Sequence, residues 1–171
     1  SGIDVEQLTE AEFVTRDNMW RIVEFMRQQP GEFHDCYLID SAYQVGVRDS
    51  RRIDGLYTLT KEDVLAPRPL PDTVAKGSHP IDIHSARDDV QHLTWLDQAY
   101  GIPYRCLVPV GSDNVIVAGR IASATREAFA SMRVQATCMA LGQAAGTAAA
   151  LCNRECVSVA SLDAGLLRET L

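Results

Sequence analysis

Two residues near the middle of the chain, Asp82 and His84, are suited to acid–base chemistry. They stand two positions apart at the end of residues 79–83, a stretch that predicts a strand, and such residues point to the same face of a strand. There the imidazole could take a proton as a general base while the carboxylate orients it. A surface pair at a strand end fits the same spacing, and the spacing by itself favours that simpler interpretation.

Arg48, Arg51 and Arg52 form the strongest basic cluster of the sequence. Guanidinium groups bind carboxylates and phosphates through paired hydrogen bonds, so the cluster could bind an anionic substrate. Asp49 and Asp54 lie within and beside it. An ion pair with either would give at least one arginine a structural role instead.

The sharpest local pattern is a short apolar run, then Gly119-Arg120, then a helix of small residues. The apolar run, residues 115–118, predicts a strand covered on both faces. Gly142 and Gly146 stand four apart and share one helical face, which another backbone could approach closely. Free amides at the helix start could stabilise negative charge on a ligand. Close packing of the helix on a sheet also explains the glycines, and the spacing alone favours it.

The cysteines and histidines give no metal or disulfide pattern. The five cysteines are odd in number and include no C-x-x-C pair, so we expect reduced thiols in a cytoplasmic protein. Cys152 and Cys156 more often pack as small apolar groups than hold a metal, and no histidines stand at a familiar ligand spacing. A serine hydrolase is disfavoured because Ser50 and Ser123 lack the G-x-S-x-G context.

Composition places the chain among ordinary folded proteins. It has 171 residues, 46% hydrophobic and 23% charged, a length that suits about one domain. The net charge of −7 and the isoelectric point near 5.0 argue against binding to nucleic acid or an anionic membrane surface. Residues 134–152 carry no charge, but their many alanines and glycines fit a buried helix better than a bilayer span.

Periodicity and turn residues predict the elements that would carry these residues. A capping box of Thr9 and Glu12 is expected to open the first helix, and Gly55 to mark a bend or bulge in a strand. Helices are expected over residues 11–29, 60–65, 134–153 and 161–171. Strands are expected over residues 36–39, 43–47, 51–59, 79–83, 104–108 and 115–118, with an exposed loop over residues 85–91.

Several segments are characteristic in combination. They are Tyr104-Arg-Cys-Leu-Val-Pro109, Asn114-Val-Ile-Val-Ala-Gly-Arg120, Ser123-Ala-Thr125 and Met139-Ala-Leu-Gly-Gln-Ala-Ala-Gly-Thr-Ala-Ala-Ala-Leu151, with Gly46-Val-Arg-Asp-Ser-Arg-Arg-Ile53 and Pro80-Ile-Asp-Ile-His84 upstream. Together they resemble the closing part of a family of FAD-dependent oxidoreductases within the wider glutathione-reductase-like class. The resemblance covers residues 45–153.

The resemblance implies an α+β or α/β fold in which the last strand of an FAD-binding, Rossmann-like domain ends near the flavin. The following helix would point its N-terminus at the ring and stabilise the negative charge of the reduced cofactor. Gly119 and Arg120 would then border the flavin. The backbone N–H groups that would reach its ring belong to Ala136, Thr137, Cys138 and Met139.

The resemblance also implies a reaction. The parent enzyme would transfer a hydride from a small organic substrate to FAD, and the catalytic candidates are His84, Arg48 and Asp82. Residues 1–100 would form the substrate-side region, which begins with the amphipathic helix. Residues 101–171 would form the closing strand and helix of the FAD-binding domain.

The sequence departs from the family in one respect, because it contains no G-x-G-x-x-G segment to cradle the pyrophosphate of FAD. We therefore expect a C-terminal fragment whose partner is the missing N-terminal FAD-binding segment. Alone, it should be inert and bind FAD weakly or not at all. No metal, nucleic acid or membrane partner is expected.

Two other functions stay open on the sequence. The helix face with Gly142 and Gly146 could dock a partner helix in a non-catalytic interaction module, and a self-contained hydrolase could use His84 and a cysteine. Flavin absorbance of a longer polypeptide would separate the first from an oxidoreductase. Activity of this chain without flavin would support the second.

Overall fold

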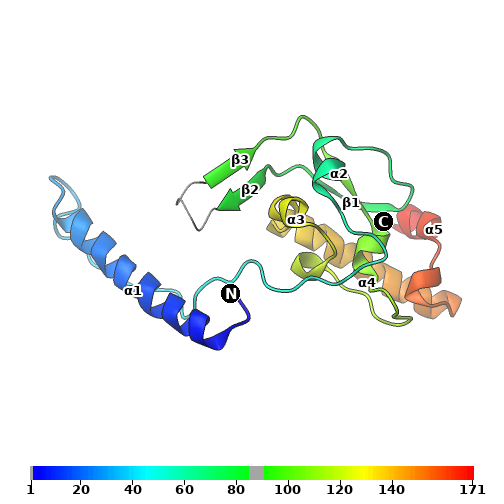
Figure 1. Cartoon of the computed structure of the whole chain (residues 1–171), viewed down its shortest axis with the longest axis horizontal. Coiled ribbons are helices and arrows are strands. Elements are labelled where there is room, and N and C mark those ends of the chain that lie inside the picture. The colour runs from blue at the N-terminus through cyan, green and yellow to red at the C-terminus, as the bar shows by residue number, and fades with distance from the viewer. Residues whose placement is uncertain (1, 85–90) are drawn as a thin grey trace. The chain divides into compact units, whose positions relative to one another are not determined.

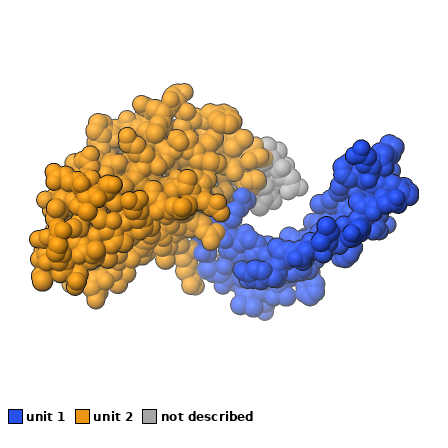
Figure 2. Space-filling model, turned by 180° about the vertical axis from the view of Figure 1, so that it is seen from behind, with its two compact units in different colours: residues 1–50 blue, residues 51–171 orange. Residues whose placement is uncertain are grey.

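The chain divides into two units, residues 1–50 and residues 51–171, which Figure 2 colours blue and orange. The computed structural model describes residues 2–84 and 91–171. The exposed loop predicted over residues 85–91 therefore lies outside the described residues, except for Gln91, which begins a strand. The division expected at residue 100 concerns which part serves the substrate and which the cofactor, and it stays a prediction.

Unit 1 consists of the long helix α1 (Val5–Arg27) and an extended segment that returns along it (Figure 1). The helix is confirmed, but the predicted start at Thr9 is wrong. Asp4 is the N-cap and accepts a hydrogen bond from the Gln7 amide at 3.0 Å. Thr9 lies inside the helix, where its hydroxyl donates to the Val5 carbonyl at 2.8 Å. An aspartate caps a helix at least as well as a threonine, so the earlier cap prevails.

The two strands predicted over residues 36–39 and 43–47 are wrong, because this segment is extended without strand pairing. Side chains of α1 bind its backbone instead. Arg27 donates to the Cys36 carbonyl at 2.8 Å, and Arg16 donates to the Tyr43 carbonyl at 3.2 Å. The Glu12 carboxylate accepts from the Val45 amide. Side chains of α1 therefore satisfy backbone groups that strand pairing would otherwise use.

The described part of unit 2 combines helices with two small antiparallel sheets, which confirms the predicted mixed α and β class (Figure 1). β1 (Thr73–Gly77) pairs with β4 (Tyr100–Pro103), and β2 (Ile81–His84) pairs with β3 (Gln91–Thr94). The helical elements are α2 (Lys61–Leu65), α3 (Arg126–Met132), α4 (Gln135–Glu155), α5 (Ala164–Thr170) and the short 3-10 helices η1 (Tyr104–Leu107), η2 (Gly119–Ile121) and η3 (Val159–Ser161).

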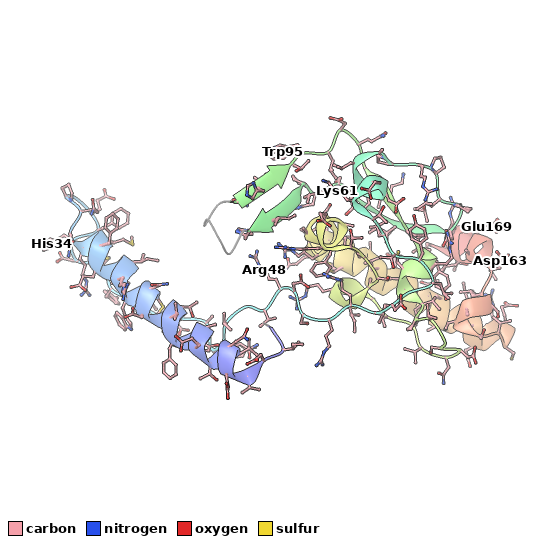
Figure 3. All side chains as sticks on the ribbon, viewed as in Figure 1. His34, Arg48, Lys61, Trp95, Asp163 and Glu169 are labelled. Carbon is pink, nitrogen blue, oxygen red and sulfur yellow. The ribbon has the colours of Figure 1, made fainter. Side chains whose placement is uncertain are left out.

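Local sequence signals decide three of these elements correctly. Thr60 and Asp63 form a capping box at the start of α2, within the helix predicted over residues 60–65. The predicted tail helix is α5, which Asp163 caps by accepting from the Gly165 amide at 2.8 Å (Figure 3). The strand predicted over residues 79–83 is β2. In each case the signal is a cap or a pattern within a few residues, so distant packing does not need to be known.

Three predicted strands differ in the structure. In the strand predicted over residues 104–108, residues 104–107 form η1 instead, because the paired segment is β4 just before it. Residues 51–59 make only isolated bridges, from Gly55 to Pro109 and from Leu59 to Ala124. Residues 115–118 are extended but form no β-bridge with another described residue. Val115 is 47% exposed. The prediction of a strand covered on both faces is therefore wrong for this segment.

α4 confirms the helix predicted over residues 134–153 and is the longest element of unit 2. Its inner face carries Leu141, Ala144, Ala148 and Leu151, which are buried and recur at helical spacing. Its outer face is open. A Cβ added at Gly142 or Gly146 would meet no heavy atom within 4 Å. The interpretation of these glycines as close helix–sheet packing is therefore wrong for the described chain. None of the described helices combines the length and apolar character that a membrane crossing needs.

Two polar contacts join the sheets to the helices. The Tyr100 hydroxyl donates to Ser131 Oγ at 2.8 Å. The Ser131 hydroxyl in turn donates to the His79 carbonyl at 2.5 Å. Burial raises the pKa of Tyr100 to about 12, although the bond to Ser131 opposes the rise. The Arg105 guanidinium binds both oxygens of Asp72, at 2.9 and 3.2 Å. Such paired bonds are the stronger kind and fix β1 relative to η1.

Gly77 faces the Tyr100 ring, whereas Gly146 faces free space. Substitution by alanine should therefore change the stability in opposite directions at the two positions. Gly77→Ala would place a methyl group against the buried Tyr100 ring and should lower the free energy of unfolding by about 1–3 kcal/mol. Gly146→Ala, the matched control, has free space and should raise it by up to about 1 kcal/mol through helix propensity. Urea denaturation of both variants measures the two effects. A stabilising Gly77→Ala or a strongly destabilising Gly146→Ala would contradict this packing.

Candidate functional site

The start of α4 presents backbone amides without a side-chain cap. Its N-cap, Val134, makes no side-chain hydrogen bond, and the first amides of a helix lack partners within it. The Cys138 amide donates to the Val134 carbonyl at 3.0 Å. Of the four predicted amide donors, Cys138 and Met139 are therefore used inside the helix. Ala136 and Thr137 remain available, and Gln135 joins them.

η2 lies against this helix start. Gly119 has a φ of 72°, in the left-handed region that glycine adopts without strain. A Cβ added there would lie 3.8 Å from Cβ and Sγ of Cys138 in the first turns of α4. The backbone holds η2 in place, because the Ile53 amide donates to the Ile121 carbonyl at 2.9 Å. The structure thus brings Gly119 next to the helix start, as the resemblance implies.

Arg120 adds positive charge at the same place. Burial raises the pKa of the Cys138 thiol, and the nearby Arg120 charge opposes that rise. The thiol is therefore neutral at neutral pH. Burial also raises the pKa of Cys106 to about 12. Neither thiol is suited to act as a nucleophile, which weighs against a hydrolase that uses one of them.

A second group of residues surrounds Asp82 and His84 on β2. The His84 Nε2 lies 3.4 Å from Asp82 Oδ2, so the two side chains share one face of the strand as predicted. The Gln91 side-chain amide donates to Asp82 Oδ1 at 2.9 Å. This bond lowers the pKa of Asp82 below its usual value; burial opposes the shift, and the charges of His84 and Arg133 add to it. The His84 side chain is 49% exposed and so accessible to a substrate.

Arg133 connects the Asp82–His84 pair on β2 with the start of α4. It directly precedes the N-cap of α4, and its Nη2 donates to the Asp82 carbonyl at 3.0 Å. Its guanidinium lies 5.9 Å from the centre of the Phe129 ring, and the Arg52 guanidinium lies 4.7 Å from the same centre. Both distances permit a cation–π interaction. Arg52 of the predicted arginine cluster thus packs on α3.

Arg48, labelled in Figure 3, belongs to unit 1 and has an exposed side chain. Its predicted contact with a substrate stays a prediction.

The five cysteines are all free thiols. Within residues 2–84 and 91–171, no three His, Cys, Asp or Glu side chains gather in a way that could hold a metal ion.

Sequence reasoning missed Gln91, Arg133 and the amide of Gln135. Gln91 reaches Asp82 only because β2 and β3 pair in one particular register, and no local signal in the sequence sets that register. Arg133 has a weak signal, since it stands just before the predicted helix. Gln135 lies inside the helix predicted over residues 134–153, and its amide belongs to the first turn, but it was left out of the four predicted donors.

The geometry at the start of α4 suits an electron-rich ring. Uncapped amides, a glycine without a side chain and an arginine all adjoin the same helix start, and they favour a group that carries negative charge. A family model described as FAD dependent oxidoreductase matches residues 1–171. The chain belongs to this family of FAD-dependent oxidoreductases. No match was found among curated proteins or among solved structures.

Substitution of Gly119 tests whether its backbone conformation holds the site. Gly119→Ala should lower the free energy of unfolding by about 1–2 kcal/mol, because alanine is strained at positive φ. Gly119→Asn is the matched control, since asparagine tolerates this conformation better, and it should cost clearly less. Thermal or urea unfolding of the two variants decides. Equal stability of Gly119→Ala and the parent would contradict the left-handed turn.

Proposed function

We propose that the chain forms the flavin-contacting end of an FAD-dependent oxidoreductase that transfers a hydride from a small organic substrate to FAD. The observation that carries the proposal is the start of α4, where uncapped amides lie beside Gly119 and Arg120. Membership of the family supports the choice of cofactor. FAD, when bound, supplies the group that accepts the hydride.

The cofactor-side residues act through charge and shape. The amides of Ala136 and Thr137 and the Arg120 guanidinium stabilise negative charge on the reduced ring. Gly119 leaves the approach to the helix start free of a side chain. Cys138 and Met139 contribute only through the helix dipole, because their amides are bonded within α4.

The substrate-side residues handle the proton and the substrate charge. His84 accepts the proton that the substrate loses, and Asp82 orients its ring. Their separation of 3.4 Å and the exposure of His84 support these roles. Arg48 binds an anionic group of the substrate. Residues 1–100 then serve as the substrate-side region, and residues 101–171 complete the FAD-binding domain.

The chain works, in this proposal, with a polypeptide segment that carries the pyrophosphate-binding glycine loop, as in the glutathione-reductase-like class. Two open features support a covering layer. The Gly142 and Gly146 face has free space in front of it, and the extended residues 115–118 form no β-bridge with other described residues. An added strand and helix would cover both. As a fragment without that segment, the chain is inert and binds FAD weakly.

The compartment follows from the same proposal. The five free thiols are best preserved in a reducing compartment, which supports a cytoplasmic protein.

A non-catalytic interaction module is the second candidate function. The open face of α4 favours it, because exposed Gly142 and Gly146 would let a partner helix approach closely. The two candidates differ in cofactor. An interaction module needs no flavin, whereas the oxidoreductase cannot act without it.

A visible spectrum separates these candidates. The purified polypeptide encoded by the gene that contains this chain should show the absorption bands of oxidised flavin.

Arg120→Gln should weaken FAD binding about tenfold, or ~1.4 kcal/mol, because a positive charge near the ring is lost. Arg154→Gln, in the last turn of α4, is the matched control and should leave FAD affinity unchanged. A colourless, folded protein that takes up no added FAD would contradict the oxidoreductase and favour the interaction module.

A further inference from the structure

The two oxygens of the Asp82 carboxylate have different partners. Gln91 donates to Oδ1 at 2.9 Å from the neighbouring strand β3, and His84 Nε2 faces Oδ2 at 3.4 Å. In the register of this pair, His84 is opposite Gln91 and Asp82 is opposite Leu93. The three polar side chains therefore share one face of the sheet. A carboxylate bound at one oxygen cannot rotate freely, so its other oxygen stays directed at the imidazole.

Arg133 fixes the backbone of the same aspartate. Its Nη2 donates to the Asp82 carbonyl at 3.0 Å, while its guanidinium lies over the Phe129 ring of α3. Because Arg133 directly precedes Val134, the N-cap of α4, any shift of β2 relative to the helix start would break this bond. One side chain thus ties the acid–base pair to the amides that face the flavin in the proposed function.

The contact with Asp82 also selects the tautomer of His84. A ring nitrogen that faces a carboxylate acceptor carries the hydrogen, and the other nitrogen of the neutral ring keeps its lone pair. Because Nε2 faces Asp82, Nδ1 is left as the acceptor. A base held in one tautomer is ready to take a proton without rearrangement.

We propose that Gln91 and Arg133 are positioning residues that hold Asp82 so that His84 presents Nδ1 as its proton-accepting nitrogen. The inference rests on the proposed function. When a substrate alcohol is oxidised, its O–H bond breaks and the proton forms the new N–H bond at Nδ1; bound FAD would supply the acceptor for the hydride lost from the carbon. Gln91 and Arg133 touch neither substrate nor cofactor and act only through Asp82.

Nuclear magnetic resonance of the 171-residue chain, without FAD, tests this directly. The nitrogen shifts of His84 report its tautomer, and a carboxyl carbon titration reports the pKa of Asp82. In the parent, the Nε2–H tautomer should predominate strongly. Gln91→Ala should move the ring toward the mixture of an unrestrained imidazole and raise the pKa of Asp82 toward its usual value. Arg133→Gln should act in the same direction, and Arg133→Lys should restore part of the effect by keeping a charged donor.

Thr94→Ala is the matched control, because Thr94 is exposed on the opposite face of β3. It should leave both readouts unchanged. Gln91→Asn, which keeps the amide but cannot reach Oδ1, serves as a second variant if Gln91→Ala fails to fold. A parent ring with Nδ1–H, or a folded Gln91 variant with both readouts unchanged, would overturn the proposal. A third outcome separates the two proposals. If the nuclear magnetic resonance results are as expected but the polypeptide encoded by the gene binds no flavin, the proposed function is overturned and the positioning contacts remain.

Discussion

The buried inner face of α4 determines where the flavin side of the candidate site lies. Leu141, Ala144, Ala148 and Leu151 are each at most 3% exposed, and the helix packs on β1, η2 and α5. Full burial of a leucine is worth about 1.5–3 kcal/mol, so a rotation or slide of the helix would be costly. The helix start is therefore held beside Gly119, and the hydrogen bond from Arg133 brings β2 to the same place.

The two faces of α4 differ in a way that indicates a missing partner. The inner face is satisfied within the chain, whereas the outer face holds two glycines with nothing in front of them. Each such glycine costs a helix about 1 kcal/mol relative to alanine. That cost has no compensation within the described chain. A covering backbone would provide it, and both candidate functions require such a partner at this face.

The sequence predicts what depends on neighbouring residues and fails where distant pairing decides. The capping box of Thr60 and Asp63 and the periodicity of α4 are local, and both are found in the structure. Residues 115–118 have the composition of a central strand, yet a strand also needs neighbours at both edges, and composition cannot supply them. The proximity of Gly119 to α4 followed from the family resemblance, whereas Gln91 was missed because its role depends on strand register.

Hydrogen exchange in the polypeptide encoded by the gene, with and without FAD, tests whether the start of α4 is the flavin site. If these groups contact the ring, FAD should protect the amides around Gly119 and those of Ala136 and Thr137 at the start of α4. Amides in the last turn of α4 should change little, which provides an internal reference. Protection confined to other parts of the chain, or none at saturating FAD, would contradict the assignment of this helix start as the flavin site.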